Sequence, residues 1–166
     1  MLIMRKNLSL NHIIVLLSIG ILFFASSCTE SILYQKHKKI PDFIWKYDYK
    51  VPFNFGIKDE KAKYNTYFNL RTSSYYPYSN IWILVKKFNK NGSLISEKKY
   101  EFILADIDGR WFGDGLGDII DNKLSLENNI SLESKGEYSY YINHEMRSDN
   151  LDGIMDIGIS VEKVIE

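Results

Sequence analysis

The chain has 166 residues, 45% of them hydrophobic and 25% charged, and its 21 basic and 21 acidic side chains cancel to a formal net charge of zero. This balance provides no excess of basic residues for binding a nucleic acid. About 140 residues remain after the export signal described next, which is enough for one globular domain with its own core.

Residues 1–27 have the three parts of a bacterial lipoprotein signal. Two basic residues near the start precede an apolar stretch over residues 13–24, and the small residues Ala25-Ser26-Ser27 lead directly to Cys28. We therefore predict cleavage before Cys28 and acylation of its thiol, with palmitate as a typical chain. The protein would then be anchored to a membrane by lipid and would not span it.

The alternative is a transmembrane helix over residues 8–27, with Cys28 incidental. A membrane span needs about 20 apolar residues, whereas Ser18 and Gly20 interrupt a shorter stretch here. The lipoprotein signal is therefore favoured. Because Cys28 is the only cysteine in the sequence, its acylation removes disulfides, cysteine nucleophiles and thiolate metal sites from consideration.

Residues 28–41 are predicted to be the lipidated cysteine and a flexible tether, and residues 42–166 a single β-sandwich domain. The tether region is polar, carries a basic run over residues 36–39 ahead of Pro41, and shows no sustained apolar period. Contact of the basic run with lipid head groups is an alternative to a solvated linker.

Alternation of apolar and polar residues predicts antiparallel strands after residue 42. Odd-numbered positions from 43 to 57 are apolar, which favours one extended segment, and Pro52 indicates that this strand lies at an edge of its sheet or is broken there. Residues 64–70 alternate in the same way. The continuous apolar run over residues 81–85 suits a central strand.

The second half of the sequence predicts further strands. Asn91-Gly92 predicts a type I′ hairpin turn, with a return strand over residues 100–104. Short apolar pieces follow at 124–126 and 130–132, and alternating strands at 138–142 and 157–161. No amphipathic helix is evident after the signal. About eight strands rich in Tyr, Ile and Phe predict an all-β fold, an antiparallel β-sandwich of the jelly-roll or immunoglobulin-like kind.

Three segments carry a resemblance to a known family. The first is Arg71 with residues 75–82 (YYPYSNIW), the second is residues 108–118 (DGRWFGDGLGD), and the third is residues 146–158 (MRSDNLDGIMDIG). Their order and spacing, together with the signal, resemble the gliding-motility lipoprotein GldH family of the Bacteroidetes. The motif residues to which we assign a structural role are Gly109, Trp111, Gly113, Gly115, Gly117, Asp118, Met146, Arg147, Leu151, Gly153, Asp156 and Gly158.

The resemblance implies an outer-membrane lipoprotein without enzymatic activity, needed for the gliding machinery and for the type IX secretion system, which exports and displays surface adhesins. It implies other envelope proteins of these systems as partners, and it supplies no catalytic residues. The periplasmic face is favoured, because Thr29-Glu30-Ser31 lacks the acidic run that surface lipoproteins of this group tend to carry after the cysteine.

The aromatic cluster Tyr75, Tyr76, Tyr78 and Trp82 is the candidate surface for a partner or ligand. Pro77 within it predicts a rigid turn that holds the rings in place. One alternative is that these rings belong to the sandwich edge or core. Another is that they stack on a glycan, so a glycan-binding envelope lipoprotein is the alternative function.

Aspartates 106, 108, 114 and 118 lie among the glycines of the second segment. Oxygen ligands on a Gly-rich loop suit Ca²⁺, but the spacing is not that of an EF-hand loop and no bidentate glutamate follows. Asx turns are favoured over calcium. We therefore expect no metal, and no cofactor other than the covalent lipid on Cys28.

Two further residues have a structural interpretation. Arg147, close in sequence to several aspartates, is predicted to fix its loop by pairing with a carboxylate, whereas recognition would require it to be exposed in a concave site. His144 shares the alternating face of Tyr140 and Ile142, which predicts a hydrogen-bonded core histidine.

The motifs of common hydrolases are missing from the sequence. It has no Gly-x-Ser-x-Gly elbow and no His-Glu-x-x-His helix. Glycoside hydrolysis by two carboxylates has no specific support, because acids on turns are expected in any soluble domain. We expect no enzyme and no catalytic residue.

Overall fold

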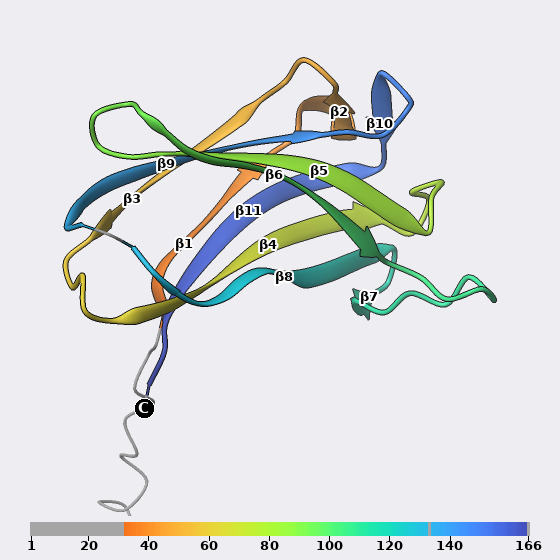
Figure 1. The fold of residues 1–166 in the computed structure, drawn as a ribbon. Helices are drawn as coiled ribbons and strands as arrows, with labels where there is room; N and C mark the ends of the chain where they lie inside the picture. The colour runs from red at the N-terminus through yellow and green to blue at the C-terminus, as the bar shows by residue number, and fades with distance from the viewer. Residues whose placement is uncertain (1–31, 133, 166) are drawn as a thin grey trace, which may run out of the picture. The chain divides into compact units, whose positions relative to one another are not determined.

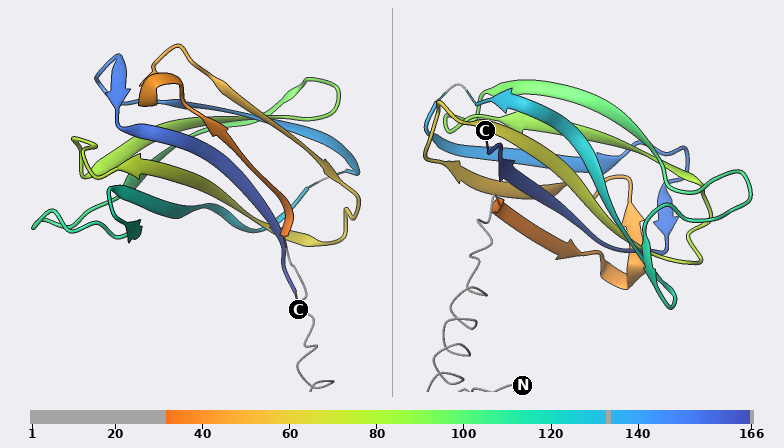
Figure 2. Two further views of the ribbon diagram at one scale, coloured as in Figure 1. Left: turned by 180° about the vertical axis from the view of Figure 1, so that it is seen from behind. Right: turned by 90° about the horizontal axis from the view of Figure 1, so that it is seen from below.

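The computed structural model describes residues 32–132 and 134–165. They form two stacked antiparallel sheets (Figures 1 and 2), with strand orders β1-β11-β4-β8-β7 and β3-β9-β5-β6, while β10 and β2 pair separately. This confirms the predicted antiparallel sandwich. The elements are β1 (Ile32–Lys39), a 3₁₀ turn η1 (Pro41–Phe43), β2 (Ile44–Lys46), β3 (Val51–Ile57), β4 (Lys63–Ser73), β5 (Asn80–Phe88), β6 (Leu94–Ile103), β7 (Asp114–Leu116), β8 (Ile119–Ser131), β9 (Gly136–His144), β10 (Asn150–Asp152) and β11 (Ile154–Lys163).

The core lies between the two sheets and is built from alternate residues of the strands. In β3, every second side chain is buried, from Val51 through to Ile57. Trp45, Phe68 and Tyr140 are fully buried within the same cluster. This burial at every second position is the physical basis of the alternation seen in the sequence.

Two strand positions predicted from the sequence are confirmed. β5, which contains the apolar run 81–85, lies between β9 and β6 in its sheet. β3 lies at the edge of the same sheet, where Pro52 is opposite Tyr141 of β9. An edge position tolerates proline because the missing N–H has no second neighbour to bond.

The long strand predicted over residues 43–57 is wrong, because the chain turns in its middle. η1 and β2 precede a turn in which the Tyr49 N–H donates to the Lys46 carbonyl at 3.0 Å, and β3 starts only at Val51. Phe43 and Tyr47 are consequently exposed, at 51% and 49%. Trp45 stays buried and donates its indole N–H to the Tyr49 carbonyl at 3.0 Å, which stabilises the turn.

The hairpin predicted around Asn91-Gly92 exists, but its type I′ turn does not. Phe88 pairs with Leu94, so the loop spans residues 89–93, and only Gly92 among them has a positive φ, at 76°. The Asn89 carboxamide oxygen accepts the N–H groups of Asn91 and Ser93, both at 3.0 Å. This side-chain bonding favours the longer loop. The apolar pieces near 124 and 130 also belong to one strand, β8.

The flexible tether predicted through residue 41 is wrong from residue 32 onward. Residues 32–39 form β1, which pairs with β11 antiparallel from Ile32–Glu162 to Lys39–Asp156. Tyr34 packs on Phe55 of the opposite sheet with ring centroids 5.3 Å apart. Most other β1 side chains are exposed, because an edge strand buries little and its basic residues keep their charges in water.

The predicted signal peptide and the lipidation of Cys28 lie outside the described residues. Within the described ranges, no helix is long and apolar enough to cross a membrane. Both N-terminal predictions concern residues that precede β1.

A buried ion pair joins the two sheets. Lys87 of β5 is 5% exposed, and its ammonium pairs with the Glu127 carboxylate of β8. The same ammonium lies 5.2 Å from the centroid of the Tyr140 ring. A buried lysine is tolerated only when it is paired in this way.

Candidate functional site

The three family segments meet at one end of the sandwich. The connection between β4 and β5 lies at the centre, because the Ser73 N–H donates to the Gly153 carbonyl and the Ser74 N–H to the Asp118 carbonyl, both at 2.8 Å. The Tyr76 ring lies 6.5 Å from that of Trp111. Segments separated by tens of residues in the sequence therefore form one structural region.

The predicted aromatic cluster is divided by the structure. Tyr75 is 80% exposed, whereas Tyr76 is 3% exposed and donates its hydroxyl to the Asn80 carbonyl at 3.1 Å. Its burial raises the pKa of Tyr76. Tyr76 is therefore a core residue, and its assignment to the surface is wrong. Tyr78 and Trp82 are partly exposed, at 37% and 38%, and remain available.

These two rings line a surface groove of about 570 Å³, here called the docking groove. The groove joins the first family segment to the third, because the Glu145 N–H donates to the Trp82 carbonyl at 2.8 Å and the Trp82 N–H to the Met146 sulfur at 3.2 Å. These bonds hold the start of β5 against the end of β9. The lining residues are Tyr78, Asn80, Trp82, Lys99, Glu145, Met146, Arg147 and Ser148.

One charge of the docking groove is neutralised internally. The Lys99 ammonium lies 2.6 Å from the Glu145 carboxylate, and this bond lowers the pKa of Glu145 and raises the pKa of Lys99. Asn143 donates a second hydrogen bond to Glu145 at 3.2 Å. Glu145 is therefore held in its ionised form with its partners in place.

Arg147 is the unpaired charge of the docking groove. Its side chain is exposed, and it forms no ion pair with any carboxylate in the described part of the chain. The predicted loop-fixing pair is therefore wrong. The condition for recognition, an exposed arginine in a concave site, is met instead.

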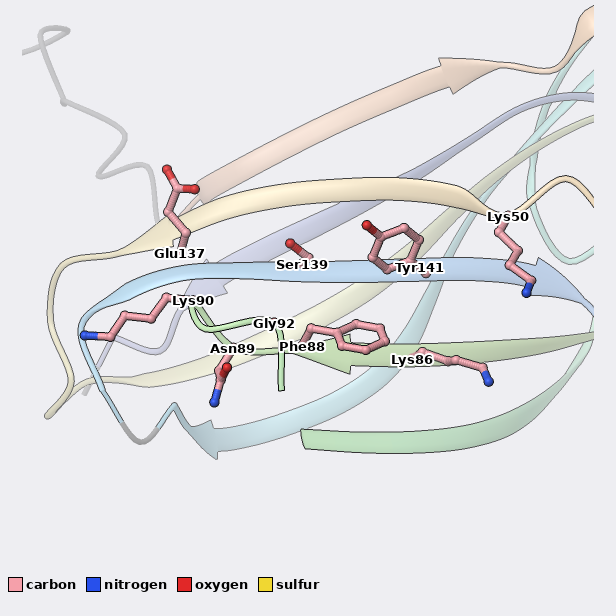
Figure 3. A pocket seen from close by; sticks show the side chains of 9 residues that line it. All are labelled: Lys50, Lys86, Phe88, Asn89, Lys90, Gly92, Glu137, Ser139 and Tyr141. Atoms are coloured by element: carbon pink, nitrogen blue, oxygen red, sulfur yellow. The ribbon is translucent and has the colours of Figure 1, made fainter. Parts of the chain in front are cut away.

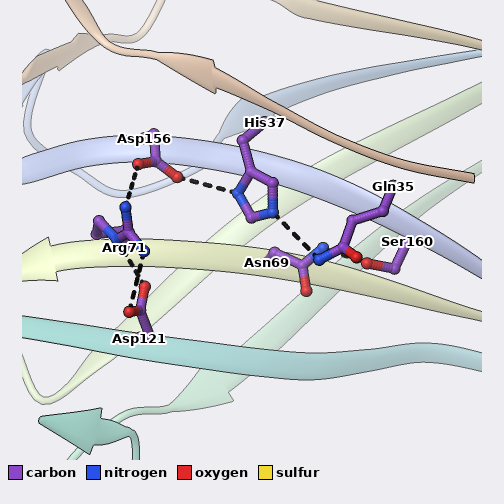
Figure 4. Close-up of polar contacts among 7 residues, drawn as sticks. All are labelled: Gln35, His37, Asn69, Arg71, Asp121, Asp156 and Ser160. Atoms are coloured by element: carbon purple, nitrogen blue, oxygen red, sulfur yellow. Dashed lines mark hydrogen bonds and ion pairs between the residues drawn. The ribbon is translucent and has the colours of Figure 1, made fainter.

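The arginine fork belongs to Arg71, on the outer face of the other sheet (Figure 4). Arg71 of β4 donates to both carboxylate oxygens of Asp121 on β8, at 2.7 and 3.1 Å. The third guanidinium nitrogen of Arg71 lies 3.5 Å from a carboxylate oxygen of Asp156 on β11. The other carboxylate oxygen of Asp156 lies 3.1 Å from Nδ1 of His37. Hydrogen bonding to Asp121 raises the pKa of Arg71. This cluster ties four neighbouring strands together.

Two glycines of the third segment occupy sites where a side chain does not fit. Gly153 has φ +82°, and a Cβ there would lie 2.8 Å from the Ser73 hydroxyl and 3.2 Å from the Tyr76 backbone. A Cβ on Gly158 would lie 2.6 Å from the Lys36 carbonyl. Both glycines thus allow other segments to approach the backbone closely.

His144 faces the core as predicted, but its predicted hydrogen bond is not found. The side chain is fully buried, and its ring lies edge-on to those of Trp45 and Tyr47, with centroids 5.4 and 5.8 Å away. Neither ring nitrogen has a hydrogen-bond partner among residues 32–132 and 134–165. Burial lowers the pKa of His144.

Asp106, two residues before the second segment, bonds within its own loop. The Asp106 carboxylate accepts the N–H groups of Asp108 and Arg110, at 3.0 and 2.8 Å, and pairs with the Arg110 side chain. These bonds lower the pKa of Asp106. Across the described ranges, no three His, Cys, Asp or Glu side chains are placed to hold a metal ion together.

Sequence reasoning did not identify Lys99 and Glu145, the charged pair that lines the docking groove. Lys99 occupies the outward position of β6, next to the inward Tyr100, so the alternation contained the signal for its exposure. Glu145 directly precedes the third segment in the sequence. No sequence pattern indicated that these two side chains pair, because the pairing depends on the strand order β9-β5-β6.

The fold and the groove define an antiparallel β-sandwich protein with a mixed aromatic and charged recess at one end. Residues 32–161 match the family described as GldH lipoprotein, and the chain belongs to this family. Its members are lipoproteins, which places the protein in the cell envelope with a membrane anchor. The resemblance of the three segments is thereby confirmed.

Two relatives cover most of the chain. The gliding motility lipoprotein GldH homolog of Christiangramia forsetii is 29% identical over 145 residues, which span 83% of this chain and 88% of the relative. The gliding motility lipoprotein GldH of Flavobacterium johnsoniae is 29% identical over 156 residues, spanning 90% of this chain and 94% of the relative.

Among solved structures, a carbohydrate-binding module specific for non-crystalline cellulose has 9% identity and a TM-score of 0.43, covering 78% of this chain and 72% of that one. A similarity of this size carries no information about ligands.

Proposed function

We propose that the protein is a lipid-anchored, non-catalytic docking module on the periplasmic face of the outer membrane, which supports gliding motility and type IX secretion by binding other envelope proteins. The observation that carries the proposal is the docking groove. There the first family segment contributes Tyr78 and Trp82, and the third contributes Met146 and the unpaired Arg147.

The composition of the groove suits a protein partner. Trp, Tyr and Arg are the residues that most often dominate binding energy at protein interfaces. Trp82 and Tyr78 offer partly exposed rings, and the Arg147 guanidinium can form a bidentate pair with a carboxylate. We therefore expect the partner to present an acidic side chain next to an apolar one.

The position of the groove suits a membrane-anchored module. Three residues lie between Cys28 and Ile32, and the four Cα–Cα steps that join them span at most about 14 Å. The unit is therefore held close to the membrane at the start of β1. The start of β5 and the end of β9, which border the docking groove, lie at the opposite end of the sandwich from the start of β1 (Figure 1). This arrangement leaves the groove accessible to envelope partners.

The biological role is tested by deleting the gene in the source organism. The proposal predicts reduced secretion of type IX substrates, loss of adhesin display and loss of surface spreading. A deletion strain with unchanged secretion, display and spreading refutes the assigned role.

The groove itself is tested in the restored strain, with cross-linked, affinity-purified protein quantified by mass spectrometry. Trp82→Ala and Arg147→Gln should each reduce the recovered envelope partner at least tenfold, which corresponds to about 1.4 kcal/mol or more. Tyr49→Ala is the matched control, because Tyr49 is 37% exposed, like Tyr78, but lies outside the groove. Equal recovery from all three variants contradicts the assignment of the groove.

A further inference from the structure

A second groove, of about 580 Å³, lies on the outer face of the four-stranded sheet, over β9 and β5 and beside the β5–β6 loop (Figure 3). We propose that it binds an acidic carbohydrate chain. This ligand class is independent of the docking proposal, because the two grooves share no lining residue. The second groove is here called the lysine groove, and the residues that define it are Lys50, Lys86, Phe88, Lys90, Glu137 and Tyr141.

An aromatic pair forms the centre of the lysine groove. Tyr141 of β9 and Phe88 of β5 lie edge to face, with centroids 5.4 Å apart and planes at 84°. Phe88 buttresses the Tyr141 ring, which is 37% exposed. A fixed and partly exposed tyrosine offers a flat face to the C–H side of a sugar ring and a hydroxyl to its polar groups. The site is thus shaped for a ring that is apolar on one face and hydroxylated at its edge.

The lysine groove carries a net positive charge. Three lysines line it against one acid, Glu137. Lys86 is paired with Glu97 of the neighbouring strand at 3.1 Å. Within the described residues, Lys50 and Lys90 have no carboxylate partner. Like charges gathered in a recess attract an anionic ligand and repel a basic one.

The spacing of the charges indicates a chain with repeated negative groups. Figure 3 shows the Lys50 and Lys86 ammonium groups at one end of the groove and Lys90 at the other, with Tyr141 between the two ends. A single phosphate or acetate contacts one end only. A polyuronate places a carboxylate on each sugar, so it can meet the lysines at both ends while one ring stacks on Tyr141.

The groove is preformed at its loop end. The Asn89 carboxamide oxygen accepts two backbone N–H groups of the β5–β6 loop, each at 3.0 Å, which fixes the conformation of this loop. Ser139 adds a hydroxyl on β9. A recess with fixed polar groups around an apolar centre loses little conformational entropy when it binds.

Isothermal titration of the detergent-solubilised full-length lipoprotein tests the proposal, with oligogalacturonate of about six sugars as the probe and maltohexaose as the neutral control. The volume of the lysine groove, about 580 Å³, lies within the usual range of ligand sites. We expect binding of the acidic oligomer that weakens as salt is added, and no heat from maltohexaose. Absence of binding by oligogalacturonate and by a sulfated or phosphorylated oligosaccharide overturns the proposal, as does equal binding of maltohexaose.

Variants assign the site. Tyr141→Ala should weaken binding at least tenfold, and the double variant Lys50→Gln with Lys90→Gln should weaken it at least tenfold and flatten its salt dependence. Tyr78→Ala, with the same exposed fraction as Tyr141, should leave sugar binding unchanged while it weakens partner docking. Each variant must keep the urea midpoint of the unaltered protein.

The same measurements exclude other ligands. Binding that survives Tyr141→Ala overturns the site. Binding to phosphatidylglycerol vesicles without binding to the oligosaccharide overturns the carbohydrate proposal in favour of a membrane contact. Neither result affects the docking groove, so failure of the two proposals is distinguishable.

Discussion

Replacement of Gly153 by alanine tests how tightly the family segments are packed. Alanine in the left-handed region is about 1–2 kcal/mol less favourable than glycine. The added Cβ would also lie 3.2 Å from the Cα and N of Tyr76, and 2.8 Å from the Ser73 hydroxyl. The hydroxyl can rotate away, but the backbone can yield only by moving the β4–β5 connection, at a further cost of about 1–3 kcal/mol. The total loss of folding stability is about 2–5 kcal/mol.

Gly92→Ala is the matched control, because Gly92 has φ +76° and no atom within 4 Å of its Cβ position. Only the backbone cost, about 1–2 kcal/mol, applies there. Urea unfolding of the protein measures both variants. With an m-value of about 2 kcal/mol/M, a loss of 3 kcal/mol lowers the midpoint by roughly 1.5 M. Equal midpoint shifts for the two variants would refute the close packing of Gly153 on Tyr76.

Three further predictions follow from the packing. Gly158→Ala should destabilise the protein by about 1–3 kcal/mol, because the added Cβ would collide with the β1 backbone. Gly56→Ala is the control, since a Cβ at Gly56 would meet no atom within 4 Å. Equal urea midpoints for the two variants would argue against β1 as a packed strand. Lys87→Met should lower the free energy of unfolding by about 3 kcal/mol, because it leaves the partly buried Glu127 carboxylate without its cation. Adding Glu127→Leu should recover most of this stability. A single variant as stable as the double variant would contradict the prediction. Because burial lowers the pKa of His144 below the unfolded value of 6.5, the neutral ring contributes stability above pH 6.5 that is lost as the pH falls below it. His144→Phe should flatten the decline in stability below pH 6.5, and an unchanged slope would show that other groups cause it.

The sequence predicted those strands whose burial is one-sided or complete. A continuous apolar run predicts β5, and Pro52 predicts that β3 is an edge strand. Both predictions succeed because they depend on local properties of the chain. β1 carries no such signal. Its stability comes from pairing with β11, more than a hundred residues away, and from the contact of Tyr34 with Phe55. A basic, mostly exposed edge strand has the composition of a linker.

The candidate site was only partly predictable for a similar reason. Sequence proximity suggested a platform from Tyr75 to Trp82, but the turn that connects β4 and β5 directs Tyr76 into the core. Sequence proximity also paired Arg147 with nearby aspartates, whereas the fork is formed by Arg71 with Asp121, across a strand pair. Contacts across strands depend on register, which alternation alone does not fix between distant segments.

The measurement that tests the central claim most directly is photo-cross-linking in intact cells from a photoreactive phenylalanine derivative at position 82. The same group at position 123, on the outer face of the other sheet, is the control. Docking through this groove predicts one discrete adduct with an envelope protein from position 82, none from position 123, and loss of the adduct when Arg147→Glu is added. No adduct from position 82, the same adduct from both positions, or an adduct that survives Arg147→Glu would contradict docking through this groove.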